Sequence, residues 1–273
     1  MNGEHTQDEV RVHADRQSLS RTVAEDLATV LATAIQRHGS ASAVLTGGGT
    51  GTSILAALAT PEVAGRVDWS RVHLWWGDER FLPPGDQERN EVQATDALLR
   101  SLVSDHDLPP HHIHRMPALT GPTSTAAEQV DAAAREYAAT LAAHAAADPG
   151  PDPRLPVLDV VLLGMGPDAH VASLFPGLPG PRVYGRTVVG VTESPKPPAE
   201  RISLTVEALC TARQIWFVVS GEDKAETVTA VQTARSEGRT DSDRWPASVV
   251  FGTEQTCWHL DQAAAGIRRL PEG

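Results

Sequence analysis

The stretch "VLDVVLLGMGPDAH", residues 157–170, joins an apolar run to a loop that carries two glycines, an aspartate and a histidine. Residues 157–163 fit a buried strand, because strands covered on both faces of a parallel sheet read as nearly continuous apolar segments. The chain then turns at once and presents Asp168 and His170. Two interpretations compete for this turn: a loop that binds nucleotide phosphates, and a site for acid–base chemistry on a small substrate.

Strands and helices alternate outward from this strand in both directions. Strands are predicted where apolar runs lie between turn residues, and helices where apolar residues recur every three or four positions. The predicted strands span 9–14, 41–45, 71–80, 186–192, 201–205, 213–220 and 247–251, and the predicted helices span 18–39, 52–60, 90–103, 123–147 and a segment from about Glu222. This alternation predicts an α/β fold with a doubly wound, mostly parallel, Rossmann-like sheet flanked by helices.

The length and composition favour one large domain. The chain has 273 residues, of which 41% are hydrophobic, which is enough to fill a sizeable core. A Pro-rich stretch at 148–156 could separate two domains, but the predicted strands on its two sides look alike. We therefore expect a flexible tail over 1–8, a single α/β domain over 9–262 and a second tail over 263–273.

Charge and composition restrict the partners. The formal net charge is −12 and no basic cluster occurs, which disfavours nucleic-acid binding. The apolar runs are too short to span a bilayer, the first ten residues lack a signal-peptide pattern, and two cysteines make no disulfide framework. A cytoplasmic protein without membrane contact is expected. An anionic ligand would need local cations and backbone N–H groups.

Four predicted strand ends carry unusual residues. They read "TGGGTG" (46–51), "GDER" (77–80), "GMGPDAH" (164–170) and "SGEDK" (220–224). In open parallel sheets, ligands bind beyond the carboxyl ends of the strands. The four segments are therefore expected to meet at one rim of the sheet and to form the functional site there.

The nucleotide interpretation of the loop rests on "GMGPDA" (164–169), which matches the dinucleotide fingerprint, with Glu193 as a candidate ribose-binding acid. Three features oppose it. Asp168 would place a negative charge where pyrophosphate should bind, and Pro167 removes a backbone N–H donor. Pro176 ends the following segment too soon for a full helix. The match is therefore weak evidence for a nicotinamide cofactor, and no cofactor is expected.

Acid–base chemistry suits the loop better. Free histidine titrates at about pH 6.5, so an imidazole at His170 can accept and return a proton near neutral pH. Asp168, two residues earlier on a tight loop, can orient that ring or favour its charged form. The competing interpretation is a packed histidine beside a surface aspartate. The position of the pair after a buried strand favours the catalytic interpretation.

The other strand ends supply candidate binding groups. The glycine-rich turn with Gly47, Gly48, Gly49 and Thr50 lacks the lysine of a P-loop, but it offers backbone N–H groups for one phosphate. A tight strand-to-helix turn is the alternative for this segment. Cations and an adjacent acid are expected to converge on the same rim; they are Asp78, Arg80, Arg201 and Lys224.

Two further searches of the sequence give no functional motif. His111, His112 and His114 lie close together in the sequence, but no cysteine or H-E-x-x-H spacing accompanies them, and no metal site is predicted. No G-x-S-x-G motif is present, so a serine-hydrolase mechanism lacks its marker.

In their order along the chain, these segments resemble the 6-phosphogluconolactonase family. The resemblance covers about residues 9 to 260 and includes "LTGGGTG", "GDERF", Asn90 in "ERNEVQA", "GMGPDAHVASLFPG", "RISLT", "SGEDK" and "PASVV". This chain departs from the family pattern at Gly49, Gly51, Ala169 and Val171, where serine, proline, glycine and threonine are usual. None of these departures removes a proton-transfer group.

The resemblance implies a fold related to glucosamine-6-phosphate deaminase and ribose-5-phosphate isomerase. It also implies hydrolysis of 6-phospho-D-glucono-1,5-lactone to 6-phosphogluconate in the oxidative pentose phosphate pathway, without a cofactor, by a monomer or weak homo-oligomer. His170 is then the expected general base toward water, oriented by Asp168, with loop N–H groups or Arg80 at the oxyanion. A sugar-phosphate isomerase or deaminase of the same fold, and a non-catalytic sugar-phosphate sensor, are the alternatives.

Overall fold

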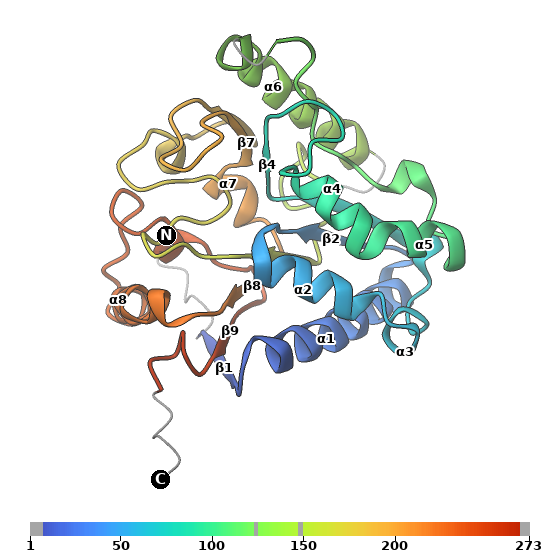
Figure 1. Ribbon diagram of the computed structural model, residues 1–273, viewed down its shortest axis with the longest axis horizontal. Helices are drawn as coiled ribbons and strands as arrows, with labels where there is room; N and C mark the ends of the chain where they lie inside the picture. Colours follow the sequence, from blue (N-terminus) through green and yellow to red (C-terminus); the bar gives the residue numbers. More distant parts are fainter. Residues whose placement is uncertain (1–7, 123–124, 147–149, 268–273) are drawn as a thin grey trace.

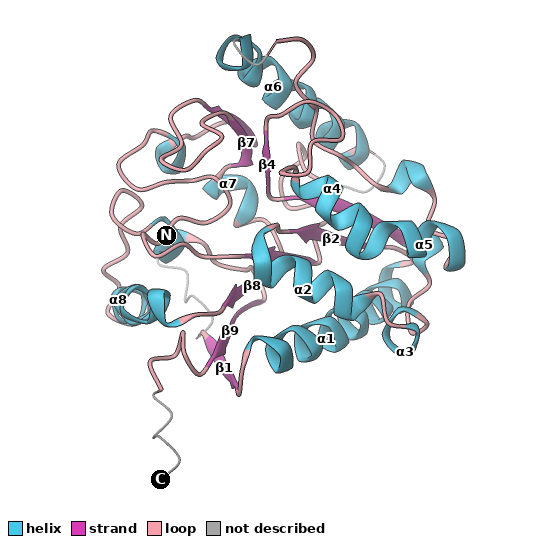
Figure 2. Cartoon of the chain, in the orientation of Figure 1, coloured by secondary structure: helices cyan, strands magenta, loops and turns pink. Residues whose placement is uncertain are grey.

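The centre of the molecule is a six-stranded sheet in which every pair of neighbours is parallel (Figure 2). The computed structural model describes residues 8–122, 125–146 and 150–267. In spatial order the strands are β1 (Glu9–His13), β9 (Gln255–Asp261), β8 (Gln214–Val219), β5 (Val160–Leu163), β2 (Ala41–Leu45) and β3 (Val72–Trp76). All residues of β2 and β5 are buried, as the uninterrupted apolar runs predict.

Helices connect the strands and cover the sheet (Figure 1). They are α1 (Arg16–His38), α2 (Gly48–Leu58), α3 (Pro61–Ala64), α4 (Asn90–Ala94), a π-helical turn (Thr95–Leu99), α5 (Arg100–Asp105), α6 (Ala126–Ala145), α7 (Val206–Leu209) and α8 (Ala225–Ser236). Short 3-10 turns occur at Trp69–Arg71, Pro110–His112, Gly180–Arg182, Glu222–Lys224 and Pro246–Val249. In the described part of the chain, no helix is long and apolar enough to cross a membrane.

The boundaries of α1 follow from its capping residues. The Asp15 side chain accepts a hydrogen bond from the backbone N–H of Ser18, and Gly39 ends the helix with a φ of 87°. The face that repeats every three to four residues is buried, which confirms the predicted amphipathic helix.

The order of the strands creates a switch point between β2 and β5. The chain moves from β1 to β2 to β3 in one direction across the sheet, and from β5 to β8 to β9 in the other. Right-handed crossovers therefore put the two sets of connections on opposite faces. The segments leaving β2 and β5 diverge, and such a divergence forms a crevice at the carboxyl ends of the two strands.

A second, three-stranded antiparallel sheet stands at this rim. It consists of β4 (Asp78–Arg80), β7 (Arg201–Leu204) and β6 (Val188–Val191). The single strand predicted over 71–80 is therefore wrong, because the chain changes sheets at Gly77. The N–H of Gly77 donates to the carbonyl of Leu45 in the large sheet, and its carbonyl accepts from the N–H of Leu204 in the small one.

The predicted last strand is also wrong. Residues 247–251 do not form a strand, because Pro246 starts a 3-10 turn whose Ala247 N–H donates to the carbonyl of Ala169. The last strand is β9 instead, which is buried along most of its length. The predicted tails lie largely outside the described residues; at their inner edges Asp8 pairs with Arg235, and Ala264 is buried.

Candidate active site

The loop after β5 folds back on itself. The N–H of Gly166 donates to the carbonyl of His170, and the N–H of Ala169 donates to the carbonyl of Gly166. A Cβ on Gly166 would lie 2.1 Å from the His170 ring, so only glycine lets the imidazole lie over this backbone. Ala169 adopts a left-handed φ of 65°. No helix opens here, so the helix N-terminus that the dinucleotide interpretation needs is missing from residues 164–178.

Asp168 and His170 form a close pair. Oδ1 of Asp168 lies 2.5 Å from Nδ1 of His170, and the two side chains are 34% and 16% exposed. Burial alone would raise the pKa of Asp168, but the hydrogen bond and charge of His170 outweigh it and lower that pKa to about 2. The Phe175 ring packs at 4.5 Å from the imidazole. With Nδ1 held by a carboxylate, Nε2 is the nitrogen left for proton transfer.

The glycine-rich turn is the first turn of α2 and the residue before it. The helix therefore begins at Gly48, four residues before the predicted start at residue 52. Gly47 and Gly48 line a cavity, whereas Gly49 and Thr50 are not among its lining residues, so their part in binding stays a prediction. A Cβ on Gly51 would lie 2.5 Å from the Thr46 carbonyl oxygen, so this glycine lets α2 approach the end of β2.

Asn90 lies directly against Gly47. A Cβ on Gly47 would lie 1.9 Å from Oδ1 of Asn90, so the turn is glycine to make room for this amide. Nδ2 of Asn90 donates to the carbonyl of Asp78 at 3.0 Å. Its Oδ1 is buried without a hydrogen-bond partner in the described part of the chain, and Asn90 lines the cavity. This oxygen is an acceptor for a ligand hydroxyl.

Asn90 is held by Glu79, which sequence reasoning missed. The fully buried Glu79 carboxylate accepts the N–H groups of Asn90 and Glu91 at 2.6 and 2.9 Å and so caps α4. Burial raises the pKa of Glu79 to about 7, against the opposing effects of Arg89 and these N–H groups. The Arg89 guanidinium is also buried and donates to backbone carbonyls, including that of Met116. An acid next to Asp78 in "GDER" was the only signal in the sequence.

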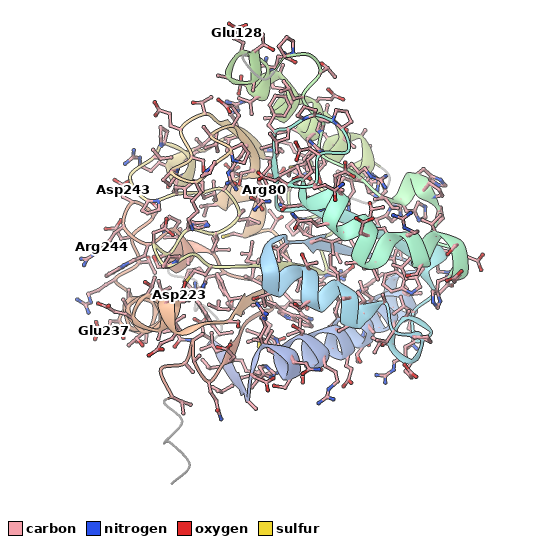
Figure 3. All side chains as sticks on the ribbon, viewed as in Figure 1. Arg80, Glu128, Asp223, Glu237, Asp243 and Arg244 are labelled. Carbon is pink, nitrogen blue, oxygen red and sulfur yellow. The ribbon has the colours of Figure 1, made fainter. Side chains whose placement is uncertain are left out.

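The cavity has a volume of about 360 Å³ and gathers all four predicted strand ends. Its lining residues are Thr46, Gly47, Gly48, Asp78, Arg80, Asn90, Gly164, Met165, Gly166, Pro167, His170, Ala172, Lys196, Arg201, Asp223 and Lys224. Figure 3 labels two of them, Arg80 on β4 and Asp223 before α8. Four cations and two carboxylates line it, so its charge is opposite to the −12 of the chain. The cavity is suited to an anionic ligand.

Asp78 is nearly buried and is fixed by Ser173, whose hydroxyl donates to Oδ2 of Asp78 at 2.7 Å. Nη1 of Arg80 donates to the carbonyl of Glu88 at 2.5 Å. Nζ of Lys224 lies 2.8 Å from Oδ2 of Asp223. The predicted rim residues are thus brought together, each with a protein partner that sets its position.

Arg201, which was predicted to bind phosphate, uses most of its N–H groups within the protein. Its Nε donates to the carbonyl of Pro198, and its Nη2 donates to the carbonyls of Lys196 and Pro197, at 3.1 to 3.2 Å. Burial lowers the pKa of Arg201. Most of its donors therefore hold the 196–198 loop in place, although the side chain also lines the cavity.

Lys196 on this loop was missed. The chain contains only two lysines, Lys196 and Lys224, and both line the cavity. The sequence did offer a signal for Lys196: nearly all the cationic residues are arginines, and lysine occurs at only two positions. Glu193 and the histidines at 111, 112 and 114 do not line this cavity.

Comparison with known proteins identifies the family of the chain. A family model described as glucosamine-6-phosphate isomerases/6-phosphogluconolactonase matches residues 14–258. The chain belongs to this family. It is 47% identical to the 6-phosphogluconolactonase of Streptomyces coelicolor over 93% of this chain and 92% of that protein.

Two further members of the glucosamine-6-phosphate isomerase/6-phosphogluconolactonase family support the match. The 6-phosphogluconolactonase of Mycobacterium leprae is 43% identical, over 94% of this chain and 96% of that protein. The crystal structure of 6-phosphogluconolactonase from Leishmania guyanensis superposes with a TM-score of 0.78 at 23% identity, covering 95% and 98% of the two chains. At that identity the likeness supports the α/β fold.

Proposed function

We propose that this protein hydrolyses 6-phospho-D-glucono-1,5-lactone to 6-phospho-D-gluconate, the second step of the oxidative pentose phosphate pathway, in the cytoplasm. One observation carries the proposal: an imidazole whose Nδ1 is held by a carboxylate lines the same cavity as four cations and the first turn of a helix. A lactone that carries a phosphate needs both parts: the base for the ester bond and the cations for the phosphate. The names of the Streptomyces and Mycobacterium relatives support the choice of lactone.

Water is a sufficient nucleophile because a lactone is an activated ester. Nε2 of His170 takes a proton from water as the water oxygen bonds to C1 of the lactone, and the carbonyl π electrons move to oxygen. When the tetrahedral intermediate collapses, the C1–ring-oxygen bond breaks. The imidazolium returns its proton to the ring oxygen, which becomes the C5 hydroxyl. Asp168 stabilises the imidazolium and fixes the tautomer that leaves Nε2 as acceptor.

The phosphate end is assigned to the cations. Lys196, Lys224 and Arg80 line the cavity, and the N-terminus of α2 contributes backbone N–H groups and the positive end of its dipole. Gly47 and Gly48 are the candidate donors to the oxyanion or the phosphate. Binding of the phosphate fixes C1 relative to the base, so that binding energy supports the chemical step.

Replacement of His170 by Ala tests the proposal. We expect kcat to fall by about 10²–10⁴-fold, because general base catalysis is lost. Turnover is measured in a pH-stat on freshly generated lactone, with the spontaneous rate subtracted. Affinity for 6-phosphogluconate, measured by calorimetry, should change little. The control is His38→Ala, an exposed histidine at the end of α1, which should keep full activity.

Two outcomes would contradict the proposal. Full lactone turnover by the His170→Ala variant would remove this imidazole from the reaction. A wild-type protein that binds 6-phosphogluconate without raising the rate above the spontaneous one would be a sensor. Turnover of glucosamine 6-phosphate would identify the deaminase alternative; we expect none, because residues 171–176 contain no acid to abstract a carbon-bound proton.

A further inference from the structure

Five of the 11 histidines gather at the amino end of β3, at the opposite end of that strand from the cavity. They come from three separate segments: β3 itself, the connection around residues 110–114, and the last turn of α6. The members are His73, His111, His112, His114 and His144. None of them takes part in the proposed hydrolysis.

Three of these rings present their nitrogens to one point. Nδ1 of His73 lies 3.1 Å from Nε2 of His114. One ligand nitrogen from each of His73, His114 and His144 lies within 4.8 Å of the other two. Two nitrogens on one tetrahedral zinc ion, each at about 2.0–2.1 Å, are separated by about 3.3–3.4 Å. The His73–His114 pair, at 3.1 Å, is already near that separation.

The surrounding residues fix the His114 ring. Its backbone N–H donates to the carbonyl of Leu74 at 2.8 Å, and its carbonyl accepts from the Tyr137 hydroxyl at 3.3 Å. The ring itself stacks on Trp75, with centroids 3.7 Å apart and planes 8° from parallel. A preorganised ligand of this kind reduces the cost of ordering the site when an ion binds.

We propose that His73, His114 and His144 bind one divalent transition-metal ion of the zinc class, with a water or His112 as the fourth ligand. Imidazole nitrogens are common zinc ligands, and His112 as the fourth ligand would close the site as in structural zinc centres. The ion would join β3, the 110–114 connection and the end of α6, so its role is structural and separate from the catalytic rim. The proposal is independent of the proposed function.

The environment of His112, the candidate fourth ligand, supports it. Nδ1 of His112 is buried and has no hydrogen-bond partner in the described residues. The centroid of its ring lies 3.9 Å from that of the His73 ring.

The test uses the full chain without a histidine tag, stripped with EDTA and dialysed. Titration calorimetry with Zn²⁺ should give one ion per chain, and the melting temperature should rise with Zn²⁺ concentration. His144→Ala and His73→Gln should each weaken binding at least tenfold. His38→Ala, which removes an exposed histidine elsewhere, and His170→Ala, which removes the imidazole of the cavity, should both bind as the wild type does.

Substitution with Co²⁺ adds a spectroscopic measurement. The wild type should show the visible absorption of four-coordinate Co²⁺, and the His144→Ala variant should lack it. Far-UV dichroism in EDTA checks that each variant is folded. The proposal fails if the wild type binds no Zn²⁺. It also fails if His144→Ala binds as tightly as the wild type, or if binding is lost in His170→Ala alone, which would place the ion in the cavity.

Discussion

At the scale of single residues, the pair of Asp168 and His170 combines strong coupling with separate roles. His170 lines the cavity and Asp168 does not. In the proposed mechanism only His170 meets the substrate, and Asp168 acts through Nδ1 of His170, which lies 2.5 Å from its Oδ1. The separation of roles depends on Gly166, which leaves space for both side chains above its Cα.

Asp168→Asn should therefore lower kcat and leave KM nearly unchanged. An amide that donates to Nδ1 holds the tautomer that carries its proton on Nε2, where the base must be free, and we expect a loss of about 10²–10⁴-fold. Steady-state kinetics on the lactone separates the two constants. Asp243→Asn, at an exposed aspartate paired with Arg182, is the matched control (Figure 3). A raised KM with unchanged kcat would show that Asp168 binds substrate instead.

At the scale of elements, the first turn of α2 is shaped by a contact with α4. Gly47 precedes the helix, and the Asn90 amide at the start of α4 fills the space that a side chain would take. The neighbouring Gly49 has a different environment: a Cβ there would lie 3.4 Å from Nη1 of Arg16, the end of a flexible side chain. Substitution of these two glycines by alanine should therefore have different effects on stability.

Gly47→Ala should destabilise the protein by about 1–3 kcal/mol and raise KM, because the Cβ displaces a buried amide that lines the cavity. Gly49→Ala should be neutral or stabilising by up to about 1 kcal/mol, because alanine lowers the entropy of the unfolded chain. Urea unfolding measures the change in stability of both variants, and lactone kinetics measures their KM. Equal effects of the two substitutions would show that Asn90 does not determine the sequence of this turn.

At the scale of the whole molecule, stability should depend on pH through His259 in β9. Burial, aided by His13 and Arg11 and opposed by Glu9, lowers the pKa of His259 to about 3. Below about pH 6.5, His259 becomes protonated in the unfolded chain but stays neutral in the folded chain. The free energy of unfolding should therefore fall with falling pH, by up to about 1.4 kcal/mol per unit from this group.

His259→Phe should flatten this dependence between pH 6.5 and 4. The Trp216 ring lies 5.3 Å from the imidazole, so the site accepts an aromatic side chain. Urea unfolding at several pH values gives the slope, with His38→Ala as the control that should keep the wild-type slope. An unchanged slope in His259→Phe would mean that other groups cause the acid sensitivity.

The sequence predicts most strands of the large sheet, because β2 and β5 are continuous apolar runs. It misses β9, for which 247–251 was predicted instead. It predicts the rim, since strand ends in a parallel sheet must meet. The strands β6 and β7 were predicted, but their separate sheet was not, because Gly77 gives no sign that the chain changes sheets there. The positions of Lys196 and Glu79 in the site could not be predicted, because they depend on contacts with Arg201 and α4 that the rarity of lysine and the pair of acids in "GDER" do not specify.

The peptide of Gly77 belongs to both sheets, and this joint has a consequence for selectivity. His170 and the α2 turn extend from the large sheet, whereas Arg80, Lys196 and Arg201 extend from the small sheet or its connections. In the proposed mechanism, the base and the phosphate ligands therefore belong to different sheets, and the distance between them depends on how the two sheets are joined at Gly77. On that mechanism we expect a sugar phosphate lactone with one carbon fewer to be hydrolysed more slowly, because its carbonyl would lie farther from His170 when its phosphate is bound.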